Sequence, residues 1–364
     1  MKKTLMLAAA LCALLPFASC GGKKSDAKAS SGSGAAVEAG GSTKDADKAA
    51  EKAAKDAKKA LKGAKDAAGA FEIIAKQLAD GQTDAALSAI DAAVSLVKNE
   101  KATPESLFRY ELTKDGSGVR LLGPADGATF AGTLVFPDTI EGLPVKEIEA
   151  INAKTFEGAT AAIIVPEGVT YFGGLKRTSD LDNNYQRHYN GIANTLVYVS
   201  LPSTLKEVGS FVYCLKLARI DIPENAPLEN IPEGFASGTS LVQFKFPSAV
   251  KSIGTYAFSG TKLTSVELPD GVEILGLDQY GNRAIDFAYC FSGCKELTSV
   301  KLPKGLQFVG DNCFTGCPNL AEVIVPEGTG KVEWGWYDGG TFRGTHLNLK
   351  SQAALKAIGY EGDF

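Results

Sequence analysis

The stretch LTSVKLPKGLQFVGDNCFTGC, residues 297–317, contains in one unit the pattern that decides the fold. A short alternating apolar run ends at a proline, a second apolar stretch ends near a glycine, and a turn carrying phenylalanine follows. Proline stops a strand because it lacks the N–H group that a sheet ladder needs. The unit therefore predicts two short strands followed by a turn.

The same unit recurs along the chain. Its apolar run and proline appear as LVFP, IIVP, VSLP, IDIP, FKFP, VELP, VKLP and VIVP. The prolines that end these runs are Pro137, Pro166, Pro202, Pro223, Pro247, Pro269, Pro303 and Pro326. Most steps between them are 21 to 24 residues long. No such unit buries its apolar positions alone, so we expect the units to stack into a solenoid of parallel strands ~4.8 Å apart.

The pattern resembles the BspA-like leucine-rich repeat family, whose unit runs L-x-x-V-x-L-P, then V-x-x-I-G, then A-F-x-G-C. Leu263–Pro269, Val250–Gly260 and Leu297–Cys317 match it nearly residue for residue. Residues 108–123 and the stretch after them resemble the family's N-terminal cap and first repeat, and residues 346–364 resemble its last strand, closing helix and Asp-Phe end. The resemblance implies a leucine-rich-repeat solenoid, a β-rich α/β repeat of short stacked parallel strands and helical turns.

The N-terminus resembles an export signal. Residues 1–19 begin with the basic MKK and continue in an apolar run of signal-peptide length, too short to span a bilayer. The run ends in FASC, which resembles a bacterial lipoprotein signal with Cys20 as the lipidated residue. This predicts an exported protein held on a bacterial membrane, at the outer membrane or cell surface. An ordinary cleaved signal peptide, or a free cysteine, is the alternative.

Two further segments separate Cys20 from the repeats. Residues 20–43 are rich in Gly, Ser, Ala and Lys, with too little apolar surface to pack, and predict a flexible tether. Residues 44–100 predict an Ala/Lys-rich helical stalk or αα-hairpin, with a first helix over 44–79 that would reach roughly 50 Å. The repeat domain is then 104–364, with an N-terminal cap at 105–136, repeats over about 137–345 and a C-terminal cap at 346–364.

The Lys-rich part of the first predicted helix allows two interpretations. Residues 44–66 hold eight Lys against five acidic residues, which would suit contact with a polyanion or lipid headgroups. The competing interpretation, a solvated stalk that holds the repeats off the membrane, needs no ligand.

The cysteines fit the repeat register better than a metal site. Cys290 to Cys313 and Cys294 to Cys317 are each 23 residues apart, one repeat length, and Cys214 holds the same position as Cys294. A stacked ladder aligns thiols in rows, whereas zinc needs four converging thiolates. We therefore expect all five to be buried packing residues. A disulfide between adjacent rungs, Cys294 to Cys317, stays open for an exported protein.

Three repeats carry insertions that break the pattern: residues 174–190, 277–286 and 331–340. The first two enter at the same position of the unit, after Gly173 and Gly276, and should emerge from the same edge of the solenoid. Their aromatic, Arg and amide side chains are of the kinds that recur at binding surfaces. The candidate binding residues are Tyr185, Arg187, His188, Tyr189, Tyr280, Asn282, Arg283, Trp334, Trp336 and Tyr337. The alternative is that the loops cover an end of the domain and that the two Trp pack on the C-terminal cap.

Composition and motifs favour a binding protein over an enzyme. The chain has two His, a formal net charge of −4, and none of the G-x-S-x-G, H-E-x-x-H or Walker motifs. We expect no catalytic residue, cofactor, metal or nucleic-acid partner. The resemblance implies a surface adhesin that recognises an extracellular protein, glycan or other cells through an edge of the solenoid. A non-adhesive structural or scaffolding lipoprotein of the periplasm is the competing prediction.

Overall fold

A computed structural model gives the fold of the repeats, of the segment before them and of the C-terminal cap. The chain divides into two compact units, Met1–Asp56 and Ala57–Phe364, and every helix and strand named below belongs to the second unit. The structure describes residues 55, 59, 61–80, 82–97, 100–128, 130, 132–152, 160–176, 195–335 and 340–364. Cys20 and the predicted tether lie outside this part of the chain. None of the described helices is long and apolar enough to cross a bilayer.

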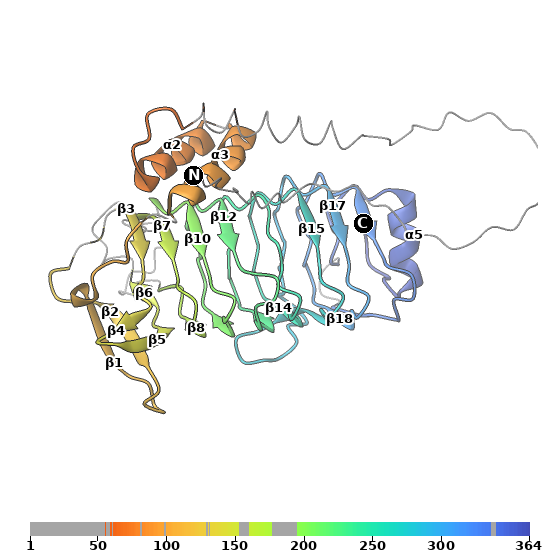
Figure 1. The fold of residues 1–364 in the computed structure, drawn as a ribbon. Coiled ribbons are helices and arrows are strands. Elements are labelled where there is room, and N and C mark those ends of the chain that lie inside the picture. The colour runs from red at the N-terminus through yellow and green to blue at the C-terminus, as the bar shows by residue number, and fades with distance from the viewer. Residues whose placement is uncertain are drawn as a thin grey trace, which may run out of the picture. The chain divides into compact units, whose positions relative to one another are not determined.

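The strands form two rows, one from each strand of the repeat unit (Figure 1). The first row contains the strands that end near a proline: β3 (Gly132–Val135), β7 (Thr160–Ile164), β10 (Tyr198–Ser200) and β12 (Arg219–Asp221) in one sheet, then β15 (Ser265–Glu267), β17 (Ser299–Lys301) and β19 (Glu322–Ile324) in another. All pairings within these two sheets are parallel. The predicted leucine-rich-repeat solenoid is confirmed.

The second row begins with the N-terminal cap. Its first sheet runs β1 (Phe108–Leu112), β2 (Val119–Pro124), β5 (Leu143–Ile148), β8 (Tyr171–Phe172) and β11 (Glu207–Val208), with β4 (Thr139–Ile140) paired to β5. The next sheet runs β13 (Asn230–Ile231), β14 (Ser252–Gly254), β16 (Ile274–Leu277), β18 (Phe308–Val309) and β20 (Glu333–Trp334). Shorter elements are β6 (Ile151–Asn152), β9 (Leu175–Lys176) and the 3-10 turn η1 (Glu105–Leu107). The β1–β2 and β4–β5 pairs are antiparallel, so the cap ends the parallel stack with a hairpin.

A ladder of phenylalanines fills the space between the two rows. Phe258, Phe291, Phe314 and Phe342 stack with ring centroids 5.2 to 5.3 Å apart and ring planes within 3° of parallel. Each is fully buried, and each comes from the turn of its own repeat. The ring spacing is close to the strand spacing, so one buried ring per rung continues the core from repeat to repeat.

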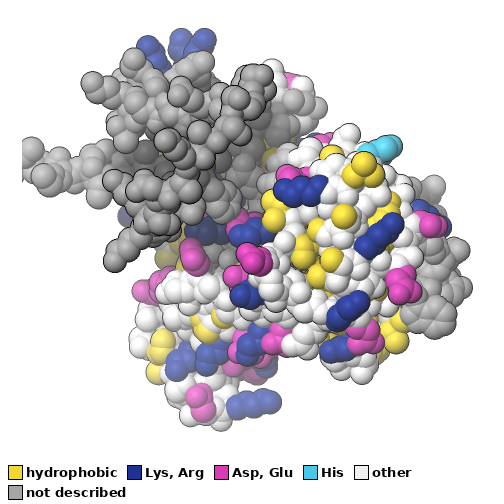
Figure 2. Space-filling model, turned by 90° about the vertical axis from the view of Figure 1, so that its right-hand side faces the viewer, with side chains coloured by type: hydrophobic (Ala, Val, Ile, Leu, Met, Phe, Trp, Pro, Cys, Tyr) yellow, Lys and Arg dark blue, Asp and Glu magenta, His cyan; other side chains and the backbone are white. Residues whose placement is uncertain are grey.

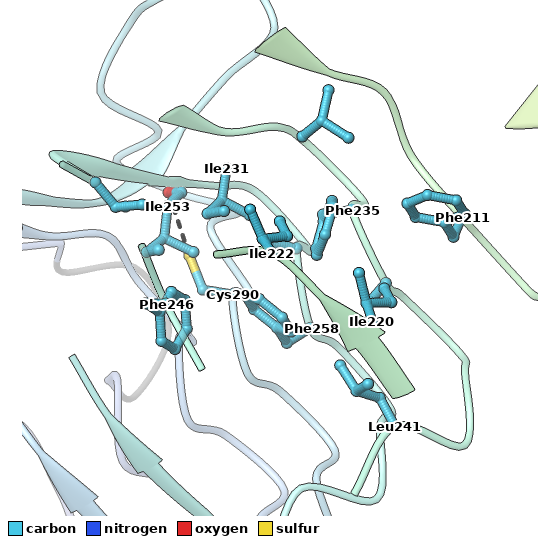
Figure 3. Close-up of a cluster of buried hydrophobic side chains, with 14 of the residues drawn as sticks. Phe211, Ile220, Ile222, Ile231, Phe235, Leu241, Phe246, Ile253, Phe258 and Cys290 are labelled. Carbon is cyan, nitrogen blue, oxygen red and sulfur yellow. Dashed lines mark hydrogen bonds between the residues drawn. The ribbon is translucent and has the colours of Figure 1, made fainter. Parts of the chain in front are cut away.

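The ladder changes geometry at Phe235, which meets Phe258 edge-on with ring planes at 68° (Figure 3). Gly238 donates its backbone N–H to the Ser259 carbonyl, and Gly260 donates its own to the Ser292 carbonyl. These equivalent hydrogen bonds align Gly238 with Gly260. In this register Phe235 takes the place of Ala257, and a small residue takes the place of Phe258. Large and small residues have exchanged positions, so the volume of the rung is kept.

A helical hairpin precedes the repeats and packs against them. It consists of α2 (Ala67–Ala79) and α3 (Thr83–Val97), and α2 contacts both β3 and β7. Phe71 of α2 lies flat on Tyr198 of β10, with ring centroids 5.6 Å apart and planes at 11°. The apolar residues that the hairpin buries form one cluster with the outward side chains of the repeat strands, which are Ala161, Ala162, Val197, Tyr198 and Ala218.

One predicted feature of this segment is wrong: a continuous helix over 44–79. Residues 61–66 are not helical, and Gly63 there has a φ of 108°, outside the right-handed helical region. A new helix begins after Asp66, whose carboxylate accepts the Gly69 N–H at 2.8 Å as an N-cap. The hairpin α2–α3 is therefore a compact element folded onto the repeats and not an extension of a long rod.

The C-terminal cap closes the other end of the repeats. Helix α5 (Leu349–Ala357) begins at Asn348, whose side chain accepts the Ser351 N–H at 2.9 Å, and packs on β19. The Ser351 hydroxyl accepts the Val323 N–H at 2.9 Å, so the cap satisfies a donor that the last strand would leave unpaired. The closing helix predicted within 346–364 is confirmed.

Candidate functional site

The second insertion forms a short antiparallel excursion after β16. Leu277 and Arg283 pair across it, and the Asp278 carboxylate closes its tip by accepting the N–H groups of Tyr280 at 2.9 Å and Asn282 at 2.7 Å. These bonds, the one from Asn282 first, lower the pKa of Asp278. Tyr280 is left 80% exposed at the tip. The loop is therefore a shaped turn that presents an aromatic ring.

Arg283 fastens this insertion to the repeats. Its guanidinium lies 5.3 Å from the ring centroid of Phe308 and donates to the Glu333 carboxylate at 2.7 Å. Phe308 and Glu333 are paired neighbours on β18 and β20, so the insertion folds back over the outward face of these strands. This ion pair joins the second insertion to the third. Arg283 is engaged within the chain, and Asn282 is bonded to Asp278.

Trp334 of the third insertion lies against the C-terminal cap. Its indole contacts Tyr360 edge-on at 4.9 Å and Phe342 at 6.1 Å. Tyr360 in turn donates its hydroxyl to the Asp363 carbonyl at 2.8 Å. A pocket of about 460 Å³ opens beside these rings, between Val332, Trp334 and the chain around Tyr360. Packing on the cap is the alternative left open for the Trp residues, and for Trp334 the contacts favour it.

The other candidates lie outside the described residues. These are Tyr185, Arg187, His188 and Tyr189 of the first insertion, and Trp336 and Tyr337 of the third. Of the ten candidates the structure thus places four, and it brings Tyr280, Asn282 and Arg283 together at one edge.

Three aromatic residues next to this insertion were not predicted. Tyr256 and Tyr289 stack with ring centroids 5.0 Å apart and planes at 15°, and Phe287 stacks on Tyr289 at 6.2 Å. Both tyrosines stand four residues before the repeat glycine, a position that Gly234 and Gly340 hold in other repeats. Other rungs carry glycine or asparagine at this position, so an alignment of the repeats reveals the two large rings.

The five cysteines of the repeats are fully buried free thiols. Burial raises the pKa of Cys214 to about 12, and a hydrogen bond with Cys294 raises that of Cys317. Cys290 donates to the Gly254 carbonyl at 3.3 Å, and Cys294 contacts the Thr261 hydroxyl at 3.2 Å. These partners belong to neighbouring rungs, so the thiols join adjacent repeats. Among the residues that the structure places, no three His, Cys, Asp or Glu side chains could together hold a metal ion.

The surface at the C-terminal end is mixed in charge. Figure 2 shows basic and acidic side chains interspersed there, with apolar patches between them. Lys301 pairs with Glu267 at 2.6 Å and Lys251 with Glu229 at 2.7 Å, each across neighbouring rungs. The described part of the face in Figure 2 thus mixes both signs of charge.

Solved structures similar to this chain are bacterial leucine-rich repeat proteins. The T. pallidum protein TpLRR is 26% identical, with a TM-score of 0.43, and the match covers 72% of this chain and 99% of that one. A leucine-rich repeat protein from Bacteroides ovatus is 22% identical, with a TM-score of 0.39, over 66% of this chain and 56% of its own. A leucine rich cell surface protein from Faecalibacterium prausnitzii is 15% identical, with a TM-score of 0.31, over 73% and 99%. No curated protein matches the chain.

The sequence profile of the BspA type Leucine rich repeat region matches residues 188–286 and 287–348, in six copies. This range includes the ladder of Phe258, Phe291, Phe314 and Phe342, the ladder cysteines and the second insertion. The stacked parallel strands and the capping helix α5 agree with this match. Residues 188–348 of this chain consist of repeats of the BspA type.

Proposed function

We propose that the protein is a surface-displayed binding protein, an adhesin that recognises an extracellular protein, glycan or cell through one edge of its repeat solenoid. The observation that carries the proposal is the second insertion, which holds Tyr280 80% exposed on a turn fixed by Asp278 and by the Arg283–Glu333 ion pair. A turn ordered in this way presents its ring with little conformational entropy left to lose on binding.

Three further points support this proposal. BspA-type repeat proteins are typically bacterial cell-surface proteins, and such repeats act as binding modules and scaffolds more than as enzymes. The N-terminal sequence resembles a lipoprotein signal, so Cys20 is the proposed anchor to a bacterial membrane. The repeats build their core without the insertions, so the insertions are available for recognition.

The binding test compares the full chain with a variant whose 278–283 turn is shortened to repeat length, on a panel of matrix proteins, plasma proteins, mucins and glycans. Tyr280→Ala is the matched point variant, because it removes the exposed ring and leaves the Asp278 and Arg283 contacts in place. We expect both variants to lose binding to the panel member that the full chain binds. Equal binding by all three chains would show that the ligand does not bind through the second insertion.

A non-adhesive periplasmic scaffold is the second candidate, favoured because repeats of this type also act as scaffolds. Surface shaving separates the two. In intact cells, protease should release peptides from residues 104–364 of a displayed adhesin. Complete protection of that range, with cleavage after permeabilisation, would favour the scaffold.

A further inference from the structure

An exposed aromatic edge extends from the second insertion onto the neighbouring turns. It consists of Tyr280, Ile285 and Phe287 of one segment, together with Tyr256 and Tyr289 of two adjacent rungs. Tyr280 is 80% exposed, Phe287 54% and Ile285 48%, although each is a large apolar residue. Ring contacts join Tyr256, Tyr289 and Phe287, and Phe287 belongs to the same segment as Tyr280 and Ile285. Large apolar residues are expected singly on a surface, so several of them exposed in one segment and the turns stacked on it mark an interaction site.

The backbone holds two of these rings at a conformational cost. Tyr256 and Tyr289 have φ values of 55° and 47°, in the left-handed region that large residues rarely adopt. Other rungs place Gly234, Gly340 and Asn312 at the equivalent position, with φ of 61°, 96° and 60°, so residues that tolerate a positive φ better than tyrosine meet the needs of this turn. Strain that packing does not require is concentrated at functional sites. What the two tyrosines add is a stacked pair of rings at the edge.

The charges around the aromatic edge are acidic. Asp278 and Asp286 flank Tyr280 and Phe287 in the sequence. Burial is the main cause that raises the pKa of the Tyr256 phenol, and the nearby Tyr289 and the Glu233 carboxylate raise it further. The segment 274–292 has one basic residue, Arg283, which Glu333 neutralises at 2.7 Å. An apolar centre with an acidic rim complements an apolar segment flanked by basic side chains.

From this arrangement we infer that the aromatic edge is a docking surface for a protein segment that carries aromatic or aliphatic side chains between Lys and Arg residues. The inference rests on the proposed binding function and names the class of partner. A glycan is the less favoured ligand, because the Tyr256–Tyr289 stack covers one face of each ring, and Phe287 stacks on Tyr289 as well.

The test measures binding of the full chain to an array of 12-residue peptides with a central Trp-Leu pair. In one set Lys and Arg flank the pair, in a second set Glu flanks it, and in a third set the pair is replaced by Ser. We expect binding to the first set only. Tyr280→Ser with Phe287→Ser should weaken it by roughly tenfold or more, the loss typical of an aromatic hot spot. Asp286→Lys should weaken it and reduce its salt dependence.

Leu349→Ser is the matched control. Leu349 is 82% exposed on α5, so the change also removes an exposed apolar side chain, and it should leave peptide binding unchanged. Thermal melts of every variant check that the fold is kept. Equal binding by the double variant, or equal binding of Glu-flanked peptides, would overturn the inference. Binding to glycans or whole proteins without any peptide binding would overturn it too, yet leave the proposed function standing. No binding to any of these ligands would count against both.

Discussion

At the scale of single residues, the core is governed by one large side chain per rung. Phe244 is an exception that adds a second ring to its rung, since it stands where other repeats have valine, as Val266 does in the next one. Its ring lies 5.5 Å from Phe235 and 5.2 Å from Phe258, beside the rung in which Phe235 and its small neighbour have exchanged places. The extra ring therefore packs against the ladder at the point where its geometry changes, in edge-on contact with Phe235.

Replacing one ring of the regular ladder should therefore be costly. Phe314 is fully buried between Phe291 and Phe342 at 5.3 and 5.2 Å. Phe314→Ala should lower the free energy of unfolding by about 3 to 5 kcal/mol, because it loses apolar burial and leaves a cavity. Urea denaturation followed by circular dichroism measures this. Tyr280→Ala, at an exposed position, should cost less than about 0.5 kcal/mol, and equal losses at the two sites would contradict the ladder as the source of stability.

The ladder cysteines should be unreactive in the native chain. A chain expressed from residue 21 keeps Cys214, Cys290, Cys294, Cys313 and Cys317, all fully buried, and burial raises the pKa of Cys214 to about 12. At pH 8 we expect no alkylation of the folded chain and five alkylated thiols after denaturation without reductant. A count of three would show that Cys294 and Cys317, or Cys290 and Cys313, are joined as a disulfide.

At the scale of elements, the turn of the second insertion should depend on pH through Asp278. The pKa of this carboxyl is lowered in the folded chain by the hydrogen bonds it accepts from backbone N–H groups, that of Asn282 first. The stability that the ionised carboxylate gives the turn is therefore fully present above the ordinary pKa of Asp, about 3.9. It is lost as the pH falls through the lowered pKa of the folded chain. The amide shifts of Tyr280 and Asn282, followed by NMR, should titrate with a midpoint below the ordinary value. Asp278→Asn should abolish that titration, and a midpoint at or above the ordinary value would contradict the bonded turn.

The helical hairpin belongs to the repeat domain in its packing. Arg219 of β12 donates to Asp91 of α3 at 2.6 Å and to Asp221 at 2.7 Å, and Asp221 accepts the Tyr198 hydroxyl at 2.9 Å. This network lies next to the Phe71–Tyr198 stack. The first helices therefore cover the outward face of the N-terminal repeats, a face that later repeats leave polar with Ser265, Ser299 and Glu322.

Removing the hairpin should destabilise the repeats that it covers. Phe71→Ala deletes a fully buried ring and should lower the midpoint of unfolding, with a cost of about 3 to 5 kcal/mol. A chain that begins at residue 104 would expose Ala162, Val197 and Tyr198 together and should associate in solution, as sedimentation velocity can measure. A monomeric truncated chain with an unchanged melting temperature would contradict this role of the hairpin.

The repeats could be predicted well from the sequence because the residues that determine the structure of each repeat lie close together in the chain. Pro303 ends a strand, Gly316 supplies a left-handed turn and Phe314 faces the core, and all three lie within one unit. The docking of the hairpin was missed because it depends on a contact between Phe71 and Tyr198, far apart in sequence. A signal was nonetheless present, since the outward positions of β7 and β10 carry Ala162 and Tyr198 where polar residues would suit solvent.

The place where the second insertion leaves the repeats was predicted, but the contacts of its residues were not. The insertion after Gly276 does emerge at an edge with Tyr280 exposed, because insertions cannot enter a packed ladder. Arg283 is engaged by Glu333, a pairing between two insertions that spacing could not reveal. Tyr256 and Tyr289 lie inside regular repeats, so a search confined to the insertions passed over them.

At the scale of the whole molecule, the repeats are stable only where both ends of the stack are closed. Each rung is stabilised by its neighbours, so a last rung without a cap would expose the faces that its predecessor buries. The N-terminal end is closed by the antiparallel β1–β2 pair, and the C-terminal end by α5 and the rings of Tyr360 and Phe364 over Phe342. These two ends differ in construction but satisfy the same need.

A chain that ends at residue 345 tests this need. It loses the Ser351 hydroxyl that accepts the Val323 N–H, and it uncovers Leu320 and Phe342, which are fully buried in the intact chain. We expect it to self-associate through the open strand edge and to bind a hydrophobic dye, because an exposed edge with an apolar face pairs with other chains. Leu349→Ser, which changes an exposed residue of the same helix, should remain monomeric and bind no dye. If the truncated chain stayed monomeric with the melting temperature of the intact protein, the stack would be stable without its cap, and the contacts of α5 would serve something other than closure.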